Sequence, residues 1–190
     1  MQNFSSEDTL FWKTKGINWM RWSGVPEYYE GMAAIEAIVD YVGTDTVRDI
    51  GSGYGRLCKF FDPKKYIGYD INPAAASRAK ILFPSYKIYH WDLTALPYAT
   101  STILVNSLIV INNEEIVDFL KLVSQNTDNI IISEVMDNTH HPEGLPFNFY
   151  SRTLDAYCQI LDSLNFKLSS SVNNQHTLYD KFVTVAKFSR

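Results

Sequence analysis

The sequence has few cysteines, no excess of basic residues and no long hydrophobic run, and each shortage excludes a class of protein. Its two cysteines, Cys58 and Cys158, are too few for the disulfide framework of a small secreted domain. No uninterrupted apolar stretch approaches the ~20 residues that cross a bilayer, and the first residues lack the apolar core of a signal peptide. We therefore expect a cytoplasmic protein in a reducing compartment, with no membrane contact and with both cysteines buried.

Basic residues are also in short supply, since 17 lysines and arginines stand against 21 acids, for a formal net charge of −4. Nucleic-acid-binding domains are normally basic, so a nucleic-acid partner is not expected. The length of 190 residues predicts one domain. We place it at residues 26–190, after an N-terminal aromatic arm at residues 1–25 that holds three of the four tryptophans. The arm either covers the binding cleft as a lid or only anchors on the domain.

The most informative stretch is Val47–Leu57, which reads as a strand, a glycine turn and the start of a helix. Glycines alternate at Gly51, Gly53 and Gly55. Without Cβ atoms they let a ligand approach the backbone, and they allow the positive φ of a sharp turn. A helix beginning there would offer unpaired N–H groups to a phosphate or a carboxylate. The dinucleotide fingerprint needs a further glycine where Arg56 stands, so the turn alone leaves a dinucleotide, an amino-acid-like cofactor and a plain turn open.

Polar residues also end the next three predicted strands. Asp70 stands where a carboxylate can bind a ribose diol. Asp92 can accept a hydrogen bond from an exocyclic amine, and Leu93 beside it can supply an apolar surface. Asn106 ends the strand that follows. Because the carboxyl ends of parallel strands meet at one edge of a sheet, we expect these residues to surround one ligand.

Together these residues resemble the motifs of class I S-adenosylmethionine-dependent methyltransferases, over about residues 28–188. Asp49 with the three glycines resembles the first motif, Asp70 the ribose-binding acid, and Asp92 with Leu93 the adenine-contacting pair. The resemblance implies S-adenosylmethionine as the cofactor. It also implies the following cofactor-binding residues: Asp49, Gly51, Ser52, Gly53, Gly55, Asp70, Ile71, Asp92, Leu93 and Asn106.

The alternation of strand and helix patterns predicts an α/β fold with a doubly wound, mostly parallel sheet. The resemblance adds a Rossmann-like order of seven strands, 3-2-1-4-5-7-6, with strand 7 antiparallel. We expect strands at residues 46–50, 66–70, 86–89, 102–106, 129–135, 166–172 and 178–188, with a turn at Asn173-Asn174 before the last. We expect helices at residues 27–42, 72–83 and 151–164, a helix capped by Asn112 or Asn113, and a short one after the glycine turn, with Leu57, Phe60 and Phe61 inward; Ser151 should cap the helix at 151–164.

The long loop at residues 136–150 is the place to look for a catalytic base. Because the unperturbed histidine side chain titrates near neutral pH, His140 or His141 is the expected catalytic residue, with Glu134 and Asp137 as further candidates. Surface histidines without a catalytic role are the alternative. Asp137-Asn138 resembles a metal-holding pair of catechol-type O-methyltransferases, but the fourth strand ends in Asn106 and no acid, so no metal is expected.

The acceptor is the least determined part of the prediction. The Asp/Asn-Pro-Pro-Tyr/Phe signature of enzymes that methylate amino groups on nucleic acids or proteins is absent, and Asn106-Ser107-Leu108-Ile109 stands in its place. This favours a small-molecule acceptor, methylated on oxygen or nitrogen. A protein- or RNA-modifying enzyme and a non-catalytic scaffold subunit that binds the cofactor are the alternatives, and the oligomeric state is open.

Overall fold

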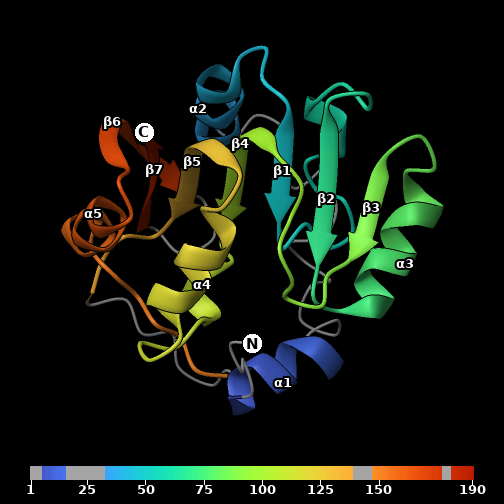
Figure 1. Ribbon diagram of the computed structural model, residues 1–190, viewed down its shortest axis with the longest axis horizontal. Helices are drawn as coiled ribbons and strands as arrows, with labels where there is room; N and C mark the ends of the chain where they lie inside the picture. Colours follow the sequence, from blue (N-terminus) through green and yellow to red (C-terminus); the bar gives the residue numbers. More distant parts are fainter. Residues whose placement is uncertain (1–5, 16–32, 139–146, 177–180) are drawn as a thin grey trace.

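The computed structural model describes residues 6–15, 33–138, 147–176 and 181–190. One seven-stranded sheet runs through it in the order β3-β2-β1-β4-β5-β7-β6 (Figure 1). The strands are β1 (Val47–Ile50), β2 (Tyr66–Asp70), β3 (Lys87–His90), β4 (Ala99–Val105), β5 (Thr127–Glu134), β6 (Lys167–His176) and β7 (Lys181–Ser189). Strands β1 to β5 pair in parallel, and β7 is antiparallel to both β5 and β6. The predicted fold class and strand order are confirmed.

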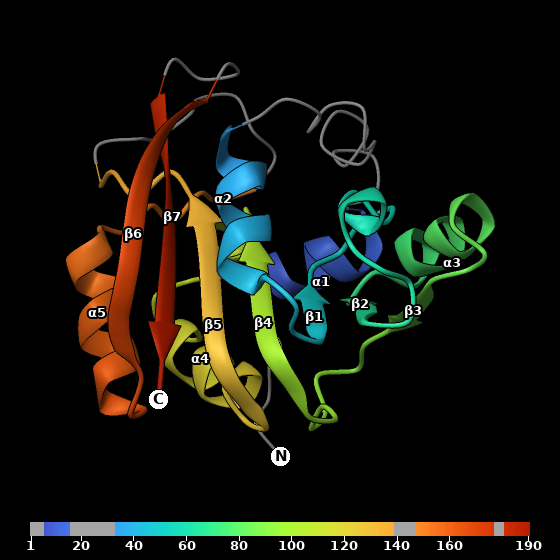
Figure 2. The same ribbon diagram turned by 90° about the horizontal axis from the view of Figure 1, so that it is seen from above.

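Helices cover both faces of the sheet, as Figure 2 shows from above. The α-helices are α1 (Glu7–Thr14), α2 (Ala33–Val42), α3 (Pro73–Leu82), α4 (Ile116–Val123) and α5 (Leu154–Ser163), and the 3-10 helices are η3 (Cys58–Phe60) and η4 (Leu108–Val110). Apolar side chains of α2 and α3 pack on one face, and those of α4 and α5 pack on the other. No helix within the described ranges is long and apolar enough to cross a membrane.

Helix α3 begins where the sequence predicts, and α5 begins slightly later. The Asn72 side chain accepts hydrogen bonds from the N–H groups of Ala74 and Ala75, and Pro73 occupies the first turn. The expected cap of α5 at Ser151 is wrong, because Thr153 caps the helix through the N–H of Ala156. The Ser151 hydroxyl instead donates to backbone carbonyls that follow β5.

The prediction of a short helix directly after the glycine turn is wrong. The chain forms turns and then η3, a single turn of 3-10 helix. Gly55 has a φ of +82°, which is outside the helical region, and Asp62-Pro63 ends any helix only six residues later. So short a segment cannot offset the cost of nucleating an α-helix. Leu57 is fully buried, as predicted, but the segment that follows the glycine turn provides no α-helix N-terminus there.

Strand β6 is longer than predicted, whereas β7 begins later, at Lys181, and ends one residue later, at Ser189. Strand β6 continues through Asn173 and Asn174, which pair with Thr184 and Val183, so the turn predicted there is wrong. Polar residues are tolerated in β6 because it is an edge strand with an exposed surface. Helix α2 ends at Val42, directly before Gly43, and this end of the helix is as predicted. Gly43 has a φ of +58°. The expected beginning of that helix, at residues 27–32, lies outside the described residues.

The central strands are buried on both faces, and their carboxyl ends form the edge that matters for a ligand. Every residue of β1 is buried, and β4 is nearly so. Arg48 of β1 is fully buried, and its guanidinium donates to the carbonyls of Val123 and Gln125 at the end of α4. A cation at a helix C-terminus is favourable, so this bond fixes α4 against the sheet.

Candidate functional site

A cavity of about 120 Å³ lies at the carboxyl ends of β1, β2 and β4, and α1 crosses below these ends in Figure 1. Open α/β sheets bind ligands at this edge, where the chain reverses its winding direction. The cavity is lined by Thr9, Trp12, Ile50, Gly51, Arg56, Asp70, Ile71, Trp91, Asn106, Ser107, Val110, Ile111 and Phe119. Four of the predicted cofactor-binding residues are among them: Gly51, Asp70, Ile71 and Asn106.

Asp70 is the best-oriented polar group of the cavity. It is 2% exposed, and its Oδ2 and Oδ1 accept the N–H groups of Gly53 and Asn72, each at 2.8 Å. Burial raises the pKa of Asp70, while these two hydrogen bonds and the Arg56 guanidinium oppose the rise. Each carboxylate oxygen keeps a second lone pair, so a fixed Asp70 can still accept hydrogen bonds from ligand hydroxyls.

The glycine turn is closed on itself, and its conformation requires glycine. The φ of Gly51 is +75°, and a Cβ added there would lie 2.9 Å from the Cβ of Ser107. Four N–H groups of the turn have protein acceptors: those of Gly51 and Ser52 donate to the Tyr69 carbonyl, that of Gly53 to Asp70, and that of Gly55 to the Ser52 carbonyl. A pyrophosphate cradle needs unpaired N–H groups, so these four do not favour a dinucleotide.

A buried polar cluster lies under the turn. The predicted residues Asp49 and Ser52 are both fully buried and do not line the cavity. Asp49 Oδ2 accepts the Tyr66 hydroxyl at 2.6 Å, while Asp49 Oδ1 has no hydrogen-bond partner among the described residues. Burial raises the pKa of Asp49, and the Arg56 guanidinium opposes the rise. Arg56 is 7% exposed, lines the cavity and donates to the Val105 carbonyl at 2.7 Å.

The segment after β4 forms the opposite wall of the cavity. Asn106 has a φ of +49°, a conformation that asparagine tolerates better than most residues. The hydroxyl of Ser107 is buried and has no partner in the described part of the chain. Behind this wall, the Arg152 guanidinium donates to the carbonyls of Leu108 and Ile111 at 3.1 and 2.6 Å. These bonds hold the wall in one conformation.

Helix α1 closes the third side. The Glu115 carboxylate accepts the N–H and hydroxyl of Ser6 and the hydroxyl of Thr9, at 2.8–3.2 Å. The Asn72 side chain donates to the Trp12 carbonyl at 2.9 Å, and Asp8 accepts the Tyr150 hydroxyl at 2.7 Å. Trp12 lines the cavity, and its buried Nε1 has no partner among the residues that are described. The remaining tryptophans of the arm, Trp19 and Trp22, lie outside the described residues.

The adenine-contacting pair predicted at the tip of β3, Asp92 and Leu93, does not line the cavity. Asp92 is exposed and does not line the cavity, and its Oδ1 accepts the Thr94 hydroxyl at 2.6 Å, which lowers the pKa of Asp92. Leu93 is half-buried with a φ of +63° and packs on the hydrophobic core. Trp91 faces the cavity and packs edge-on against Phe119, with ring centroids 5.8 Å apart.

Sequence reasoning missed Trp91, Phe119 and the apolar pair Val110 and Ile111. The position of Trp91 directly after β3 and beside the predicted Asp92 was a usable signal. No local signal identified Phe119, since its position depends on how α4 packs over the strand tips. The predicted residues Gly53 and Gly55 also lie outside the lining. A Cβ on Gly55 would lie 2.8 Å from Phe83 Cδ2, so this glycine serves packing against the residue that ends α3.

The predicted catalytic residues His140 and His141 lie outside the described residues. Glu134 is described, at the end of β5, fully buried behind the cavity wall. Its Oε1 accepts the Tyr157 hydroxyl at 3.0 Å, and burial raises the pKa of Glu134 to about 8. Within the described ranges, no cluster of three or more acidic, histidine or cysteine side chains is suited to hold a metal ion.

No protein-family model matches the chain, and no curated protein matches it in sequence. Solved structures match its fold. Magnesium protoporphyrin IX methyltransferase from Synechocystis PCC 6803, with bound S-adenosylmethionine, is 15% identical, with full coverage of both chains and a TM-score of 0.75. A SAM-dependent methyltransferase from Methanosarcina mazei is 15% identical, with 81% of this chain and 96% of that chain covered and a TM-score of 0.69. An O-methyltransferase family 2 protein from Planctomyces limnophilus, in complex with apigenin, is 12% identical, with 77% and 51% covered and a TM-score of 0.59.

Proposed function

We propose that this protein is an S-adenosylmethionine-dependent methyltransferase that acts on a small molecule. The observation that carries the proposal is the convergence of Gly51, Asp70, Ile71 and Asn106 on one cavity at the switch point of the sheet. The solved proteins of the same fold include methyltransferases of a porphyrin and of other small molecules, one of them with S-adenosylmethionine bound. The closed glycine turn speaks against the competing dinucleotide.

The residues present fit an adenosyl cofactor with a charged amino-acid end. The bare backbone at Gly51 leaves room that a Cβ would fill, and the orphaned donors of Ser107 and Trp12 need ligand acceptors or water. Asp70 would hold the ribose hydroxyls, and Ile71 with Trp91 would contact the adenine. Arg56, the cation among the described lining residues, would face the cofactor carboxylate.

The chain's contribution to catalysis would be alignment in a dry site. The bound cofactor would supply a methyl group already activated by its positive sulfonium. The walls held by Arg152 and by α1 fix the cavity and exclude water, and alignment of this kind can lower a barrier by several kcal/mol. The proposal includes a role for the N-terminal arm, residues 1–25, as a lid over the cavity. The cavity of about 120 Å³ is smaller than the roughly 300–1,000 Å³ of small-molecule sites, so α1 would move outward to admit the cofactor.

The acceptor side of the proposal rests on the sequence. A small, neutral or aromatic acceptor suits a chain with a net charge of −4 and suits the neighbours of the same fold. A base in the loop, His140 or His141, stays a prediction. Turnover assays of His140→Ala and His141→Ala, beside their cofactor affinity, would test it.

Calorimetric titration with S-adenosylmethionine tests the central proposal. We expect micromolar binding to the wild-type protein and a loss of at least about 100-fold in Asp70→Ala, which removes the fixed carboxylate from the cavity. The matched control is Asp128→Ala, at the start of β5 and the opposite end of the sheet, which should bind normally. Heat with NAD but none with S-adenosylmethionine would refute the proposal.

A further inference from the structure

Among the described residues, the buried charges under the glycine turn do not balance. Asp49 and Asp70 are 0% and 2% exposed, and the charge of Arg56 acts on both of them. In the described part of this cleft, two carboxyl groups therefore share one guanidinium. With both acids ionised, the described part of the cleft is therefore short of about one positive charge. This shortage is unfavourable, because a buried carboxylate is costly unless it is paired and hydrogen-bonded.

Asp49 is the less satisfied of the two acids. Both oxygens of Asp70 accept backbone N–H groups, whereas Asp49 has the Tyr66 hydroxyl on Oδ2 and no described partner on Oδ1. Because Asp49 is 0% exposed, bulk solvent does not reach this oxygen. A cation that enters the neighbouring cavity therefore stabilises Asp49 without competing for a hydrogen bond that already exists.

We propose that Asp49 makes the site select the methyl donor over its demethylated product by charge. The inference rests on the proposed function. The two ligands share their adenosine and amino-acid groups, and they differ in the sulfonium of the donor, which becomes a neutral thioether when the methyl group leaves and the C–S electron pair stays on sulfur. The buried, uncompensated carboxylate attracts only the charged form. Donor binding is strengthened, and the product leaves more readily.

The size of the effect follows from Coulomb's law. At an effective dielectric constant of about 20, two unit charges within about 12 Å of each other change an affinity by about tenfold or more. Ile50, the neighbour of Asp49 in the chain, lines the cavity, so a cation bound close to it lies in this range. We therefore expect the wild-type protein to bind S-adenosylmethionine at least about tenfold more tightly than S-adenosylhomocysteine in calorimetric titrations at pH 7.5. Sinefungin, which carries an ammonium group in place of the sulfonium, should bind like the donor. Equal affinities for the three ligands would overturn the inference without any variant.

Asp49→Asn isolates the charge, because the asparagine oxygen can still accept the Tyr66 hydroxyl. We expect the donor-over-product preference to fall about tenfold, mostly through weaker donor binding. Tyr66→Phe is the complementary control: it removes the hydrogen bond that Asp49→Asn keeps, and it keeps the carboxyl group that Asp49→Asn removes, so the preference should persist. Asp128→Asn makes the same chemical change on an exposed carboxylate at the other end of the sheet and should change nothing.

The outcomes separate this inference from the function it rests on. A folded wild-type protein that binds none of the three ligands contradicts the proposed function itself. Binding of all three, with the same preference in Asp49→Asn as in the wild type, leaves the function standing and refutes the charge selection. If Asp49→Asn does not fold, the wild-type comparison of the three ligands decides.

Discussion

Gly51 is the residue at which the loops after β1 and β4 touch. Its φ of +75° and the 2.9 Å between an added Cβ and the Cβ of Ser107 penalise any side chain twice. We expect Gly51→Ala to cost about 1–2 kcal/mol of unfolding free energy for the left-handed backbone alone, with a further loss from the contact. It should also abolish ligand binding, because the shifted Ser107 lines the same cavity.

Gly43 provides the control for this prediction. Its φ is +58°, but the nearest atom to an added Cβ is the Asp40 carbonyl oxygen at 3.9 Å. Gly43→Ala therefore carries the backbone cost without the steric contact. Urea unfolding and calorimetric titration of both variants should give similar backbone penalties, a larger total for Gly51→Ala, and lost binding in Gly51→Ala alone. Equal total costs and equal binding would show that the contact with Ser107 has no effect.

At the scale of elements, α1 is the least independent helix of the fold. It has eight residues, too few to be stable alone, and its first turn is held by the Glu115 carboxylate, which accepts three hydrogen bonds from Ser6 and Thr9. A carboxylate at a helix N-terminus also complements the helix dipole. One side chain at the start of α4 therefore supplies the contacts that hold the first turn of α1.

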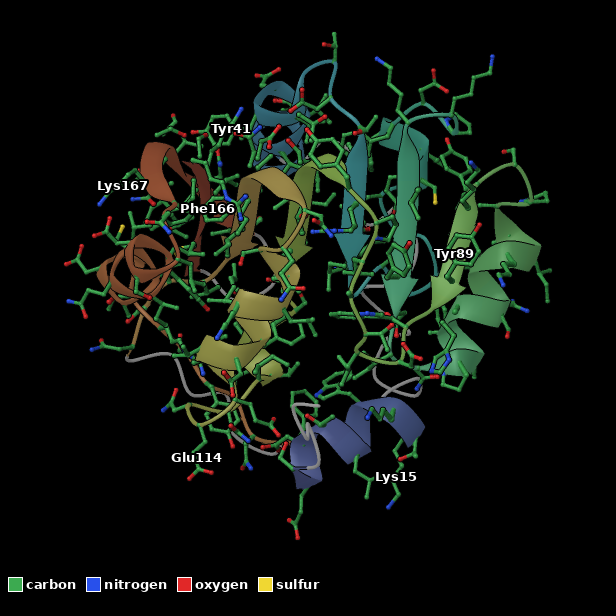
Figure 3. The ribbon with its side chains drawn as sticks, in the orientation of Figure 1. Lys15, Tyr41, Tyr89, Glu114, Phe166 and Lys167 are labelled. Carbon is green, nitrogen blue, oxygen red and sulfur yellow. The ribbon has the colours of Figure 1, made fainter. Side chains whose placement is uncertain are left out.

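Glu115→Ala should release α1 from the domain. The loss of these charge-assisted bonds, at about 1.5–3 kcal/mol, predicts an increase of at least about tenfold in amide hydrogen exchange across Glu7–Thr14, with faster cofactor dissociation. Glu114→Ala is the control, since the exposed Glu114 extends away from the molecule (Figure 3). Unchanged exchange in Glu115→Ala would mean that the other contacts of α1 are sufficient to hold it. These are the Asn72 bond to the Trp12 carbonyl, the Tyr150 bond to Asp8 and the packing of Trp12 on Phe147.

The elements also show what the sequence could predict. Strand order and the β2–α3 unit were predictable because alternation, the Asn72-Pro73 cap and the resemblance agree. The helix after the glycine turn was not, since three left-handed glycines and Pro63 outweigh the pattern of Leu57 and its neighbours. The side of the cavity made by Trp91 and Phe119 depends on tertiary packing, which periodicity does not encode. Asp92 satisfied the motif by position, yet its side chain turns to Thr94.

At the scale of the whole molecule, several buried acids give the fold a dependence on pH. Burial raises the pKa of Asp49 and Asp70 and raises that of Glu134 to about 8. Between its ordinary pKa of about 4.5 and about 8, Glu134 holds a proton in the folded state that the unfolded chain has lost. The unfolding free energy therefore falls as pH rises through this window, by about 1.4 kcal/mol per pH unit for one such group.

Glu134→Gln tests this dependence, because glutamine is neutral at every pH and its oxygen can still accept the Tyr157 hydroxyl. Urea unfolding at pH 5, 6, 7 and 8 should show a shallower fall of the unfolding free energy in the variant, which becomes the more stable protein, relative to wild type, as pH approaches 8. Tyr157→Phe should have the opposite effect. The Tyr157 hydroxyl stabilises the charged carboxylate in the wild type, so its removal raises the pKa of Glu134 further and extends the fall of the unfolding free energy to higher pH. Parallel profiles for the wild type and Glu134→Gln would mean that Glu134 is ionised in the folded protein, with the Arg152 guanidinium compensating its charge in spite of burial.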